Sequence, residues 1–455
     1  MLSLTAARLR TRAGCLLAVL AAAVLAATIP AGPARADGVR DAQQWVLEAL
    51  QAPAAWQVTE GNGVTVAVID SGVNPGVSDL AGSVTSGPDL TGVGTLSTNP
   101  HWGMHGTWMA SLIAGHGDDG GGSGIIGVAP RARVLSIRVI TDQQDPGYAR
   151  YQREPQVRVQ RELARAITYA VSHGAGVISM SLGYGRPSSV VRQALQEAFN
   201  RNVVVVASSG NSGDSAAASQ HAPYSFPADY PGVLGVAAVG QNGASAGFSS
   251  DNLSVQVAAP GVRVPAQGRD GKYWLVSGTS PACALAAGVV ALVRSRYPAL
   301  SPPLVRQAII TSASNRPAGG YDDRVGFGTV DAAEALAAAG RLAASARVND
   351  RRPPKRSALS DSHFGGGPSA VPPVPVGPRG TQPLVLYSIL GVVCLAVIVA
   401  AVSRLVMMRR QPPRGRYPPD WPAGPARDAA AGWPAGSAGN HAGVPPQQDV
   451  AWPRE

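Results

Sequence analysis

Residues 64–72 read VTVAVIDSG, and this stretch decides the class of fold. Its first six residues are apolar or β-branched, which is typical of a strand buried on both faces of a sheet. The strand pattern stops at Asp70, and Gly72 follows as a turn residue. In open α/β sheets, functional side chains gather at the carboxyl ends of the strands. Asp70 is therefore the end of a predicted strand and the first candidate for chemistry.

Similar apolar runs recur along the chain and alternate with stretches of helical spacing. This alternation is typical of a mostly parallel sheet with crossover helices, so the predicted fold class is α/β. The predicted α/β domain spans residues 63–345. Further strands are predicted at 134–140, 176–180, 202–207 and 233–239, and helices at 161–173, 281–297 and 302–312.

Composition excludes some classes of function. The chain has 455 residues and a formal net charge of +10, yet Lys272 and Lys355 are its only lysines among 38 basic residues. This bias toward arginine is typical of a GC-rich coding sequence. The chain contains no basic stripe interleaved with aromatic residues, so nucleic-acid binding is not expected. The three cysteines, Cys15, Cys283 and Cys394, fall in different regions. A disulfide within the α/β domain at 63–345 is therefore not expected.

The N-terminus has the pattern of a secretory signal peptide over residues 1–36. Three arginines precede the apolar stretch 15–27, and Ala34-Arg35-Ala36 offers a small-x-small cleavage site before Asp37. An uncleaved anchor helix is the alternative. Residues 37–62 then form a short leader of helical appearance, which contains Trp45 and Trp56.

The C-terminal part predicts a membrane tether. Residues 346–383 hold eight prolines without periodicity, as in a linker, and residues 384–402 are apolar without a charge, close to the ~20 residues that span a bilayer. One arginine precedes this run closely and several follow it, which predicts a domain outside the cell and a cytoplasmic, disordered tail at 403–455. The arginines concerned are Arg379 before it and Arg404, Arg409, Arg410, Arg414 and Arg416 after it.

Two further motifs supply what peptide hydrolysis needs beside a carboxylate: a base and a nucleophile. His105-Gly-Thr107 opens an apolar helical stretch, and Gly278-Thr-Ser280 precedes the helix predicted at 281–297. A serine at a helix N-terminus is close to free N–H groups that favour developing negative charge. The order Asp, His, Ser along the chain is the order found in subtilisin. Each residue alone has a structural alternative, as a turn former, a helix-start residue or an N-cap.

Four blocks together resemble the signatures of the subtilase family: Asp70-Ser-Gly72, His105-Gly-Thr107, Ser209-Gly-Asn211 and Gly278-Thr-Ser280. The resemblance covers about residues 60–340 and implies the three-layer subtilisin-like fold. It implies that Ser280 attacks the scissile carbonyl, that His105 takes its proton and that Asp70 orients His105. It also implies that Asn211, with the backbone N–H of Ser280, holds the oxyanion.

The same resemblance implies a substrate-binding site and raises a question about the nucleophile. Two segments are expected to be strands that pair with an extended peptide: Ser181, Leu182 and Gly183, and Ser208, Ser209 and Gly210. Phe226-Pro227 matches a place where the family has a cis peptide bond near the specificity pocket. The proline directly after the nucleophile departs from the family pattern. Because a residue before proline is pushed away from helical geometry, either the helix starts one residue late or Ser280 is strained.

No cofactor is expected. Asp118-Asp119 and the glycines after them are consistent with a calcium site or, alternatively, with a solvated loop, and no metal motif supports the former. Cys283 is expected to be a small buried hydrophobe. The expected partners are protein or peptide substrates and the lipid bilayer.

The order of signal peptide, short leader, catalytic domain, linker, membrane helix and basic tail is similar to that of the mycosins, subtilases associated with type VII secretion systems. That resemblance implies membrane components of such a system as further partners. One feature departs from it: the domain lacks the disulfides of mycobacterial mycosins. The leader departs from secreted subtilisins instead, because it is too short for a complete folding prodomain, and it is expected to pack on the domain. A catalytically weak scaffold and a general degradative protease are the alternatives.

Overall fold

The computed structural model describes residues 38–118, 123–213, 222–351 and 450–451. Within these residues the main sheet has seven strands, all of them parallel to their neighbours, in the order β2-β5-β1-β6-β7-β8-β9. The sequence predicted five of these strands to within two or three residues at each end. The seven are β1 Thr65–Asp70, β2 Val84–Asp89, β5 Arg133–Arg138, β6 Val177–Met180, β7 Val204–Ser208, β8 Leu234–Val239 and β9 Val255–Pro260.

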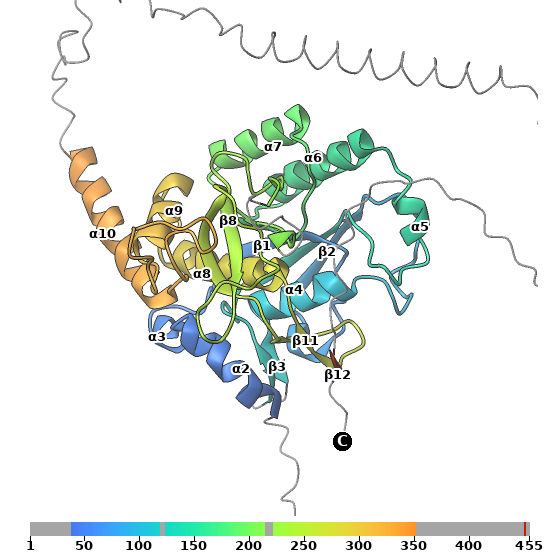
Figure 1. Cartoon of the computed structure of the whole chain (residues 1–455), viewed down its shortest axis with the longest axis horizontal. Helices are drawn as coiled ribbons and strands as arrows, with labels where there is room; N and C mark the ends of the chain where they lie inside the picture. Colours follow the sequence, from blue (N-terminus) through green and yellow to red (C-terminus); the bar gives the residue numbers. More distant parts are fainter. Residues whose placement is uncertain (1–37, 119–122, 214–221, 352–449, 452–455) are drawn as a thin grey trace, which may run out of the picture. The chain divides into compact units, whose positions relative to one another are not determined.

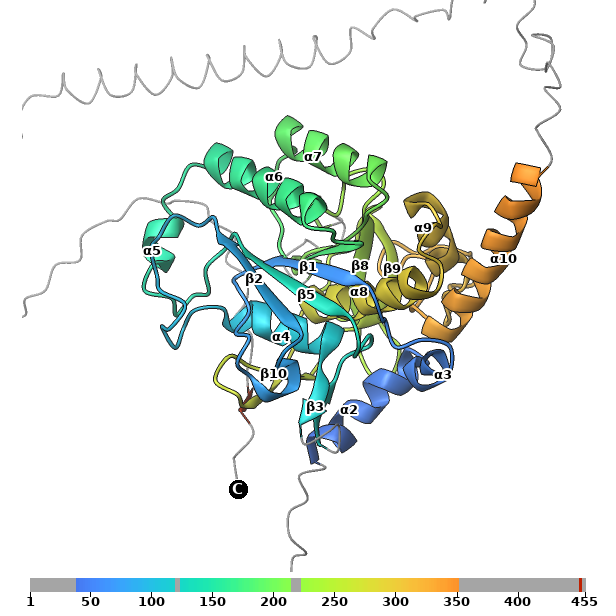
Figure 2. The ribbon, with the colours of Figure 1, turned by 180° about the vertical axis from the view of Figure 1, so that it is seen from behind.

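Helices cover both faces of the sheet, as Figures 1 and 2 show. Successive side chains of a strand point to opposite faces, so Val66 and Val68 join one apolar cluster while Ala67 and Ile69 join the other. This confirms the α/β class and the three layers implied by the resemblance. The helices α6 Gln156–Ser172 and α7 Ser189–Asn200 contribute to one cluster, and α4 Met104–Ala114, α8 Thr279–Arg296, α9 Pro302–Thr311 and α10 Ala332–Arg351 contribute to the other.

The leader packs on the catalytic domain, as expected. Its first helix, α2 Gly38–Ala49, lies beside the hairpin of β3 His116–Asp118 and β4 Ser123–Ile126, and its second, α3 Ala52–Trp56, packs against α10. The amide of Gln43 bonds both the N–H and the carbonyl of Ile126, at 3.0 and 2.7 Å, and Trp56 donates to the carbonyl of Val128 at 2.9 Å. The leader therefore satisfies backbone groups of the domain, which ties it down as part of the folded unit.

Smaller elements complete the described chain. A second sheet orders β10, β11 and β12 antiparallel, and a short helix follows the turn after β5. The strand β12 pairs residues 450–451 with residues 274–275. These elements are η1 Ser78–Leu80, α5 Tyr148–Tyr151, β10 Val264–Gln267, β11 Tyr273–Val276 and β12 Val450–Ala451.

One boundary predicted from the sequence is wrong, and several predictions lie outside the described residues. The last helix, α10, continues to Arg351, past the predicted domain end at residue 345, because no proline interrupts the chain before Pro353. The predicted signal peptide at 1–36, the apolar run at 384–402, the rest of the linker and nearly all of the tail fall outside. No helix among the described residues is long and apolar enough to cross a membrane.

Candidate active site

Asp70 and His105 form a close pair at the carboxyl edge of the sheet. The buried Asp70 ends β1, and its Oδ1 accepts hydrogen bonds from the N–H of Ser71 at 2.6 Å and from Nδ1 of His105 at 2.7 Å. Because an ionised carboxylate only accepts, the His105 proton resides on Nδ1, and Nε2 is left as a base. The His105 side chain is 15% exposed and that of Asp70 only 1%. The imidazole is thus the member of the pair that reaches solvent.

Two glycines allow the helix of His105 to approach the strand end so closely. A Cβ on Gly106 would lie 2.2 Å from the carbonyl oxygen of Gly72, and a Cβ on Gly72 would lie 2.5 Å from the ring of Trp102. The hydroxyl of Ser71 accepts the N–H of Gly106 at 3.0 Å. The Asp-Ser-Gly and His-Gly-Thr motifs therefore pack directly on each other: Gly106 makes room for the backbone of Gly72, and Gly72 makes room for the ring of Trp102 just before the helix.

Ser280 lies in the first turn of α8, which begins at Thr279. Its Oγ donates to the carbonyl of Ser181 at 3.4 Å, while the hydroxyl of Ser181 donates to the carbonyl of Ser280 at 3.0 Å. The helix does not start late at Pro281, so that alternative is wrong, and Ser280 keeps a negative φ. Pro281 is accommodated because residues of a first turn have no intrahelical partner for their N–H groups.

Asn211 is held against the start of the same helix. Its Oδ1 accepts both the N–H and the hydroxyl of Thr279 at 2.9 Å each, which leaves the Nδ2 amino group as the free donor end of the amide. This Nδ2 lies beside Gly278, where a Cβ would come within 3.4 Å of it. Gly278 has φ 151° and ψ 173°, a conformation that side chains rarely adopt. The motif Gly278-Thr-Ser280 thus holds the Nδ2 donor of Asn211 at the start of α8.

The two predicted substrate-binding segments follow neighbouring strands of the sheet. Residues 181–183 come directly after β6, and residues 208–210 end and follow β7, so these segments lie at strand ends rather than within strands. The structure adds Ser225, which the sequence analysis missed, to this place. A Cβ on Gly183 would lie 2.2 Å from the Ser225 hydroxyl, and one on Gly210 would lie 3.5 Å from it. The neighbouring Phe226-Pro227 bond is cis, as the resemblance implied.

Another carboxylate that the sequence analysis did not single out reaches His105. Asp142 follows β5, and its Oδ2 and Oδ1 accept the N–H groups of Met104 and His105 at 2.8 and 3.1 Å. Burial raises the pKa of Asp142 above its ordinary value, while the charge of His105 opposes that rise. No motif marks this aspartate, since it lies in a loop 37 residues away from His105.

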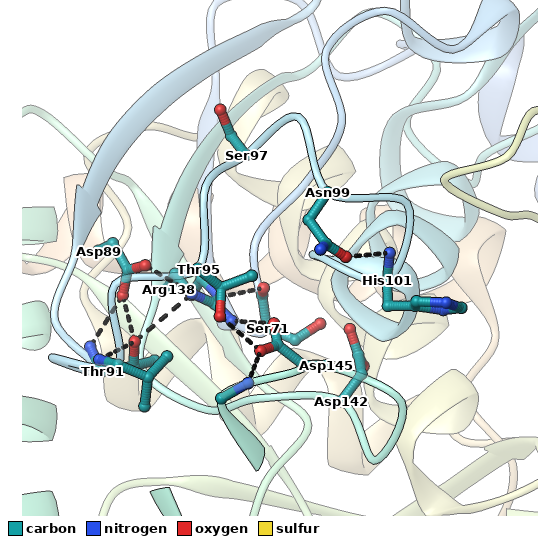
Figure 3. Close-up of polar contacts among 12 residues, drawn as sticks. Ser71, Asp89, Thr91, Thr95, Ser97, Asn99, His101, Arg138, Asp142 and Asp145 are labelled. Atoms are coloured by element: carbon teal, nitrogen blue, oxygen red, sulfur yellow. Dashed lines mark hydrogen bonds and ion pairs between the residues drawn. The ribbon is translucent and has the colours of Figure 1, made fainter. Parts of the chain in front are cut away.

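A buried arginine supports this edge of the sheet. Arg138 pairs in register with Asp70 and donates to the carbonyl of Ser71 at 3.0 Å. It also forms ion pairs of 2.5 Å with Asp89 and Asp145, as Figure 3 shows. A buried charge is tolerated when it is paired and hydrogen-bonded on several sides. The network therefore joins the turn after Asp70 to the loops that follow β2 and β5.

The other candidates have structural roles. Cys283 is fully buried, and burial raises the pKa of its thiol to about 12, so it stays protonated and unreactive. Among residues 38–118, 123–213 and 222–351, no group of three or more His, Cys, Asp or Glu side chains is arranged to hold a metal ion. Asp119 and the glycines at 120–122 lie outside the described residues.

This arrangement is that of a serine hydrolase: a carboxylate-bound imidazole, and a serine and an amide donor together at a helix N-terminus. The sequence profile of the Subtilase family, Peptidase S8, matches residues 61–328. The chain therefore belongs to the subtilase family of serine proteases.

Individual relatives agree with this family. The chain is 35% identical to thermitase of Thermoactinomyces vulgaris over 57% of its own length and 85% of that protein. It is 33% identical to Mycosin-1 of Mycobacterium tuberculosis over 64% of its own length and 72% of that protein. A solved structure of the serine protease MycP1, described as an essential component of the type VII (ESX-1) secretion system, superposes with a TM-score of 0.52 at 33% identity, covering 64% of this chain and 88% of MycP1. The domain is thus a mycosin-like subtilase.

Proposed function

We propose that this protein is a membrane-anchored serine endopeptidase of the mycosin type, which acts outside the cytoplasm with Asp70, His105 and Ser280 as its catalytic triad. The observation that carries the proposal is the 2.7 Å contact between Asp70 Oδ1 and His105 Nδ1 at the strand edge where the helix of Ser280 begins.

The reaction follows from this geometry. Nε2 of His105 removes the proton of the Ser280 hydroxyl as its Oγ attacks the scissile carbonyl, and later gives the proton to the leaving amine. Asp70 keeps the Nδ1 tautomer and stabilises the imidazolium. Nδ2 of Asn211 and the free N–H of Ser280 donate to the oxyanion, and the N-terminal end of α8 adds a favourable field.

The substrate is a protein or peptide in extended conformation. The segments 181–183 and 208–210 lie at the ends of β6 and β7, which are parallel neighbours in the sheet. Each segment can therefore offer backbone groups to a peptide bound between them. Ser225 lies against Gly183 and Gly210, which makes its small polar side chain a candidate for contact with the substrate residue held there.

Membrane anchoring and the association with type VII secretion are supported by the sequence and by the named relatives. The apolar run at 384–402 and the arginines after it favour a single span with the tail in the cytoplasm. A mycosin-like catalytic domain outside that membrane would then act on proteins secreted near its own tether. This orientation is incompatible with the pairing of β12 and β11, because residues 450–451 would lie across the bilayer from the catalytic domain.

A fluorophosphonate probe tests the catalytic part of the proposal. The full chain in membranes should be labelled, Ser280→Ala should not be, and Ser301→Ala, at an exposed helix start, should be labelled like the wild type. A folded wild-type protein that fails to label would contradict catalysis and favour the scaffold alternative.

Two further measurements test the membrane orientation and the range of substrates. Protease added to intact cells should remove the catalytic domain and spare a C-terminal tag; a tag that is digested would overturn the orientation. A comparison of secreted proteins from wild-type and Ser280→Ala cells should show a few uncleaved substrates. Broad digestion of denatured casein by the wild type would instead favour a general degradative subtilase.

A further inference from the structure

Asp142 is connected to the active site in a way that the triad mechanism does not use. The helix α4 begins at Met104, and the residue before it, Gly103, has no side chain with which to cap the helix. Asp142 supplies the missing acceptor from a different segment, because its two carboxylate oxygens take the N–H groups of Met104 and His105. Two bonds to one carboxylate hold the backbone of His105 in position.

The same carboxylate brings a second negative charge to the imidazole. Asp70 contacts the ring at Nδ1, while Asp142 interacts electrostatically with both His105 and Asp70. An anion within a few ångströms of a histidine favours its protonated form. Asp142 is partly buried, so solvent screens this interaction less than it would screen a pair on the open surface.

Other groups around His105 do not cancel that charge. The guanidinium of Arg138 is neutralised by its ion pairs with Asp89 and Asp145. The thiol of Cys283 is neutral, and the ring of Trp108, which packs against His105, carries no charge. His101 lies on the exposed loop before α4 (Figure 3). Among the described residues, the charged groups bonded to His105 are Asp70 from β1 and Asp142 from the loop after β5, while Arg138 from β5 and Cys283 from α8 lie around Asp70.

We propose that Asp142 is a positioning residue for catalysis, which holds the backbone of His105 and, through its charge, stabilises the imidazolium formed during the reaction. This inference rests on the proposed role of His105 as the base. It predicts that Asp142 helps to set the pH at which His105 becomes active, a property that a purely structural helix cap does not have.

The test is the rate of fluorophosphonate labelling measured against pH, which needs no knowledge of the substrate. Asp142→Asn and Asp142→Ser remove the charge, so the midpoint of the acid limb should move to lower pH by at least about half a unit. The labelling rate on the plateau should fall several-fold, because the His105 backbone loses one or both of its acceptors.

Asp331→Asn is the matched control. Asp331 likewise caps a helix from outside it: it is a buried aspartate, and its Oδ1 accepts the N–H of Glu334 at 2.9 Å at the start of α10. Its removal should leave the midpoint unchanged. If neither Asp142 variant moves the midpoint, or if Asp331→Asn moves it equally, the inference is overturned even though the wild type labels. A wild type that does not label overturns the proposed function, and this inference with it.

Discussion

Asp70 and Asp79 are two fully buried aspartates in the same segment of chain, and their surroundings differ in kind. Asp70 faces an ionisable imidazole. Among the described residues, the groups that donate to the Asp79 carboxylate are neutral: the N–H of Ile125 at 2.7 Å and the hydroxyls of Ser78 and Tyr273 at 3.2 Å each. The one charge that acts on it there is the like charge of Asp118. Without a cation, burial raises the pKa of Asp79 to about 6.

The aspartate side chain therefore has a structural role in the region of Asp79 and a proposed catalytic role in the region of Asp70. Around Asp79, the domain clamps the β3–β4 hairpin, whose carbonyls at residues 123 and 124 also accept hydrogen bonds of 3.1 Å from Arg40 of the leader. Around Asp70, the strand end meets a helix whose histidine is partly open to solvent. The comparison indicates that the partner of a buried carboxylate, rather than its burial, separates a catalytic aspartate from a structural one. Four predictions test this.

The largest expected effect is on rate at Asp70. Asp70→Asn should lower kcat by about 10⁴, because the amide would favour the wrong tautomer of His105. Folding should change little, and thermal unfolding monitored by circular dichroism would check this. A variant that is as unstable as an Asp79 variant would remove the distinction between the two regions.

The second largest expected effect is the fall in kcat on replacing Asn211. Asn211→Leu removes one oxyanion donor and should lower kcat by about 10²–10³ with KM nearly unchanged. Steady-state kinetics on a peptide substrate would measure it. If kcat/KM fell by the same factor because KM rose while kcat stayed unchanged, Asn211 would act in substrate binding instead.

At Asp79 the effect should fall on stability. Asp79→Ala leaves the N–H of Ile125 and the hydroxyl of Tyr273 without an acceptor, and should cost about 2–3 kcal/mol in the free energy of unfolding. Denaturant unfolding would measure the loss, with the exposed Asp41→Ala as a control expected to change it by less than about 0.5 kcal/mol. The fraction of folded protein that labels at saturation should stay at the wild-type level.

The smallest effect concerns pH. Folding raises the pKa of Asp79 from 3.8 to about 6, so the native state binds more protons than the unfolded chain in this interval. The stability contributed by Asp79 is therefore present below about pH 4 and is lost as pH rises toward and through 6, with a slope of at most ~1.4 kcal/mol per pH unit. Asp79→Asn should flatten this slope between pH 4 and 6. Parallel wild-type and variant curves would show that Asp79 does not titrate there.

The strands and helices that carry the site were largely predictable because their patterns are local. The run before Asp70 is apolar on both faces, and the structure buries both faces; the helix predicted from 281 begins two residues earlier. The pattern failed for β2, Val84–Asp89, because its polar and half-exposed residues do not resemble a buried strand. The predicted end of the domain at 345 failed because an Ala-rich helix shows no periodicity that marks its last turn.

The sequence by itself predicted the proposed nucleophile, base and orienting carboxylate, because each stands in a short motif with a glycine, and Gly72, Gly106 and Gly278 lie where close neighbours or a positive φ leave little room for a side chain. The tertiary structure alone decided what surrounds them. Parallel pairing of β1 with β5 aligns Asp70 with Arg138, and it brings the loop of Asp142 to the same edge as His105. Such neighbours depend on strand order and register, which are set by packing across the whole sheet and leave no mark on the residues that meet.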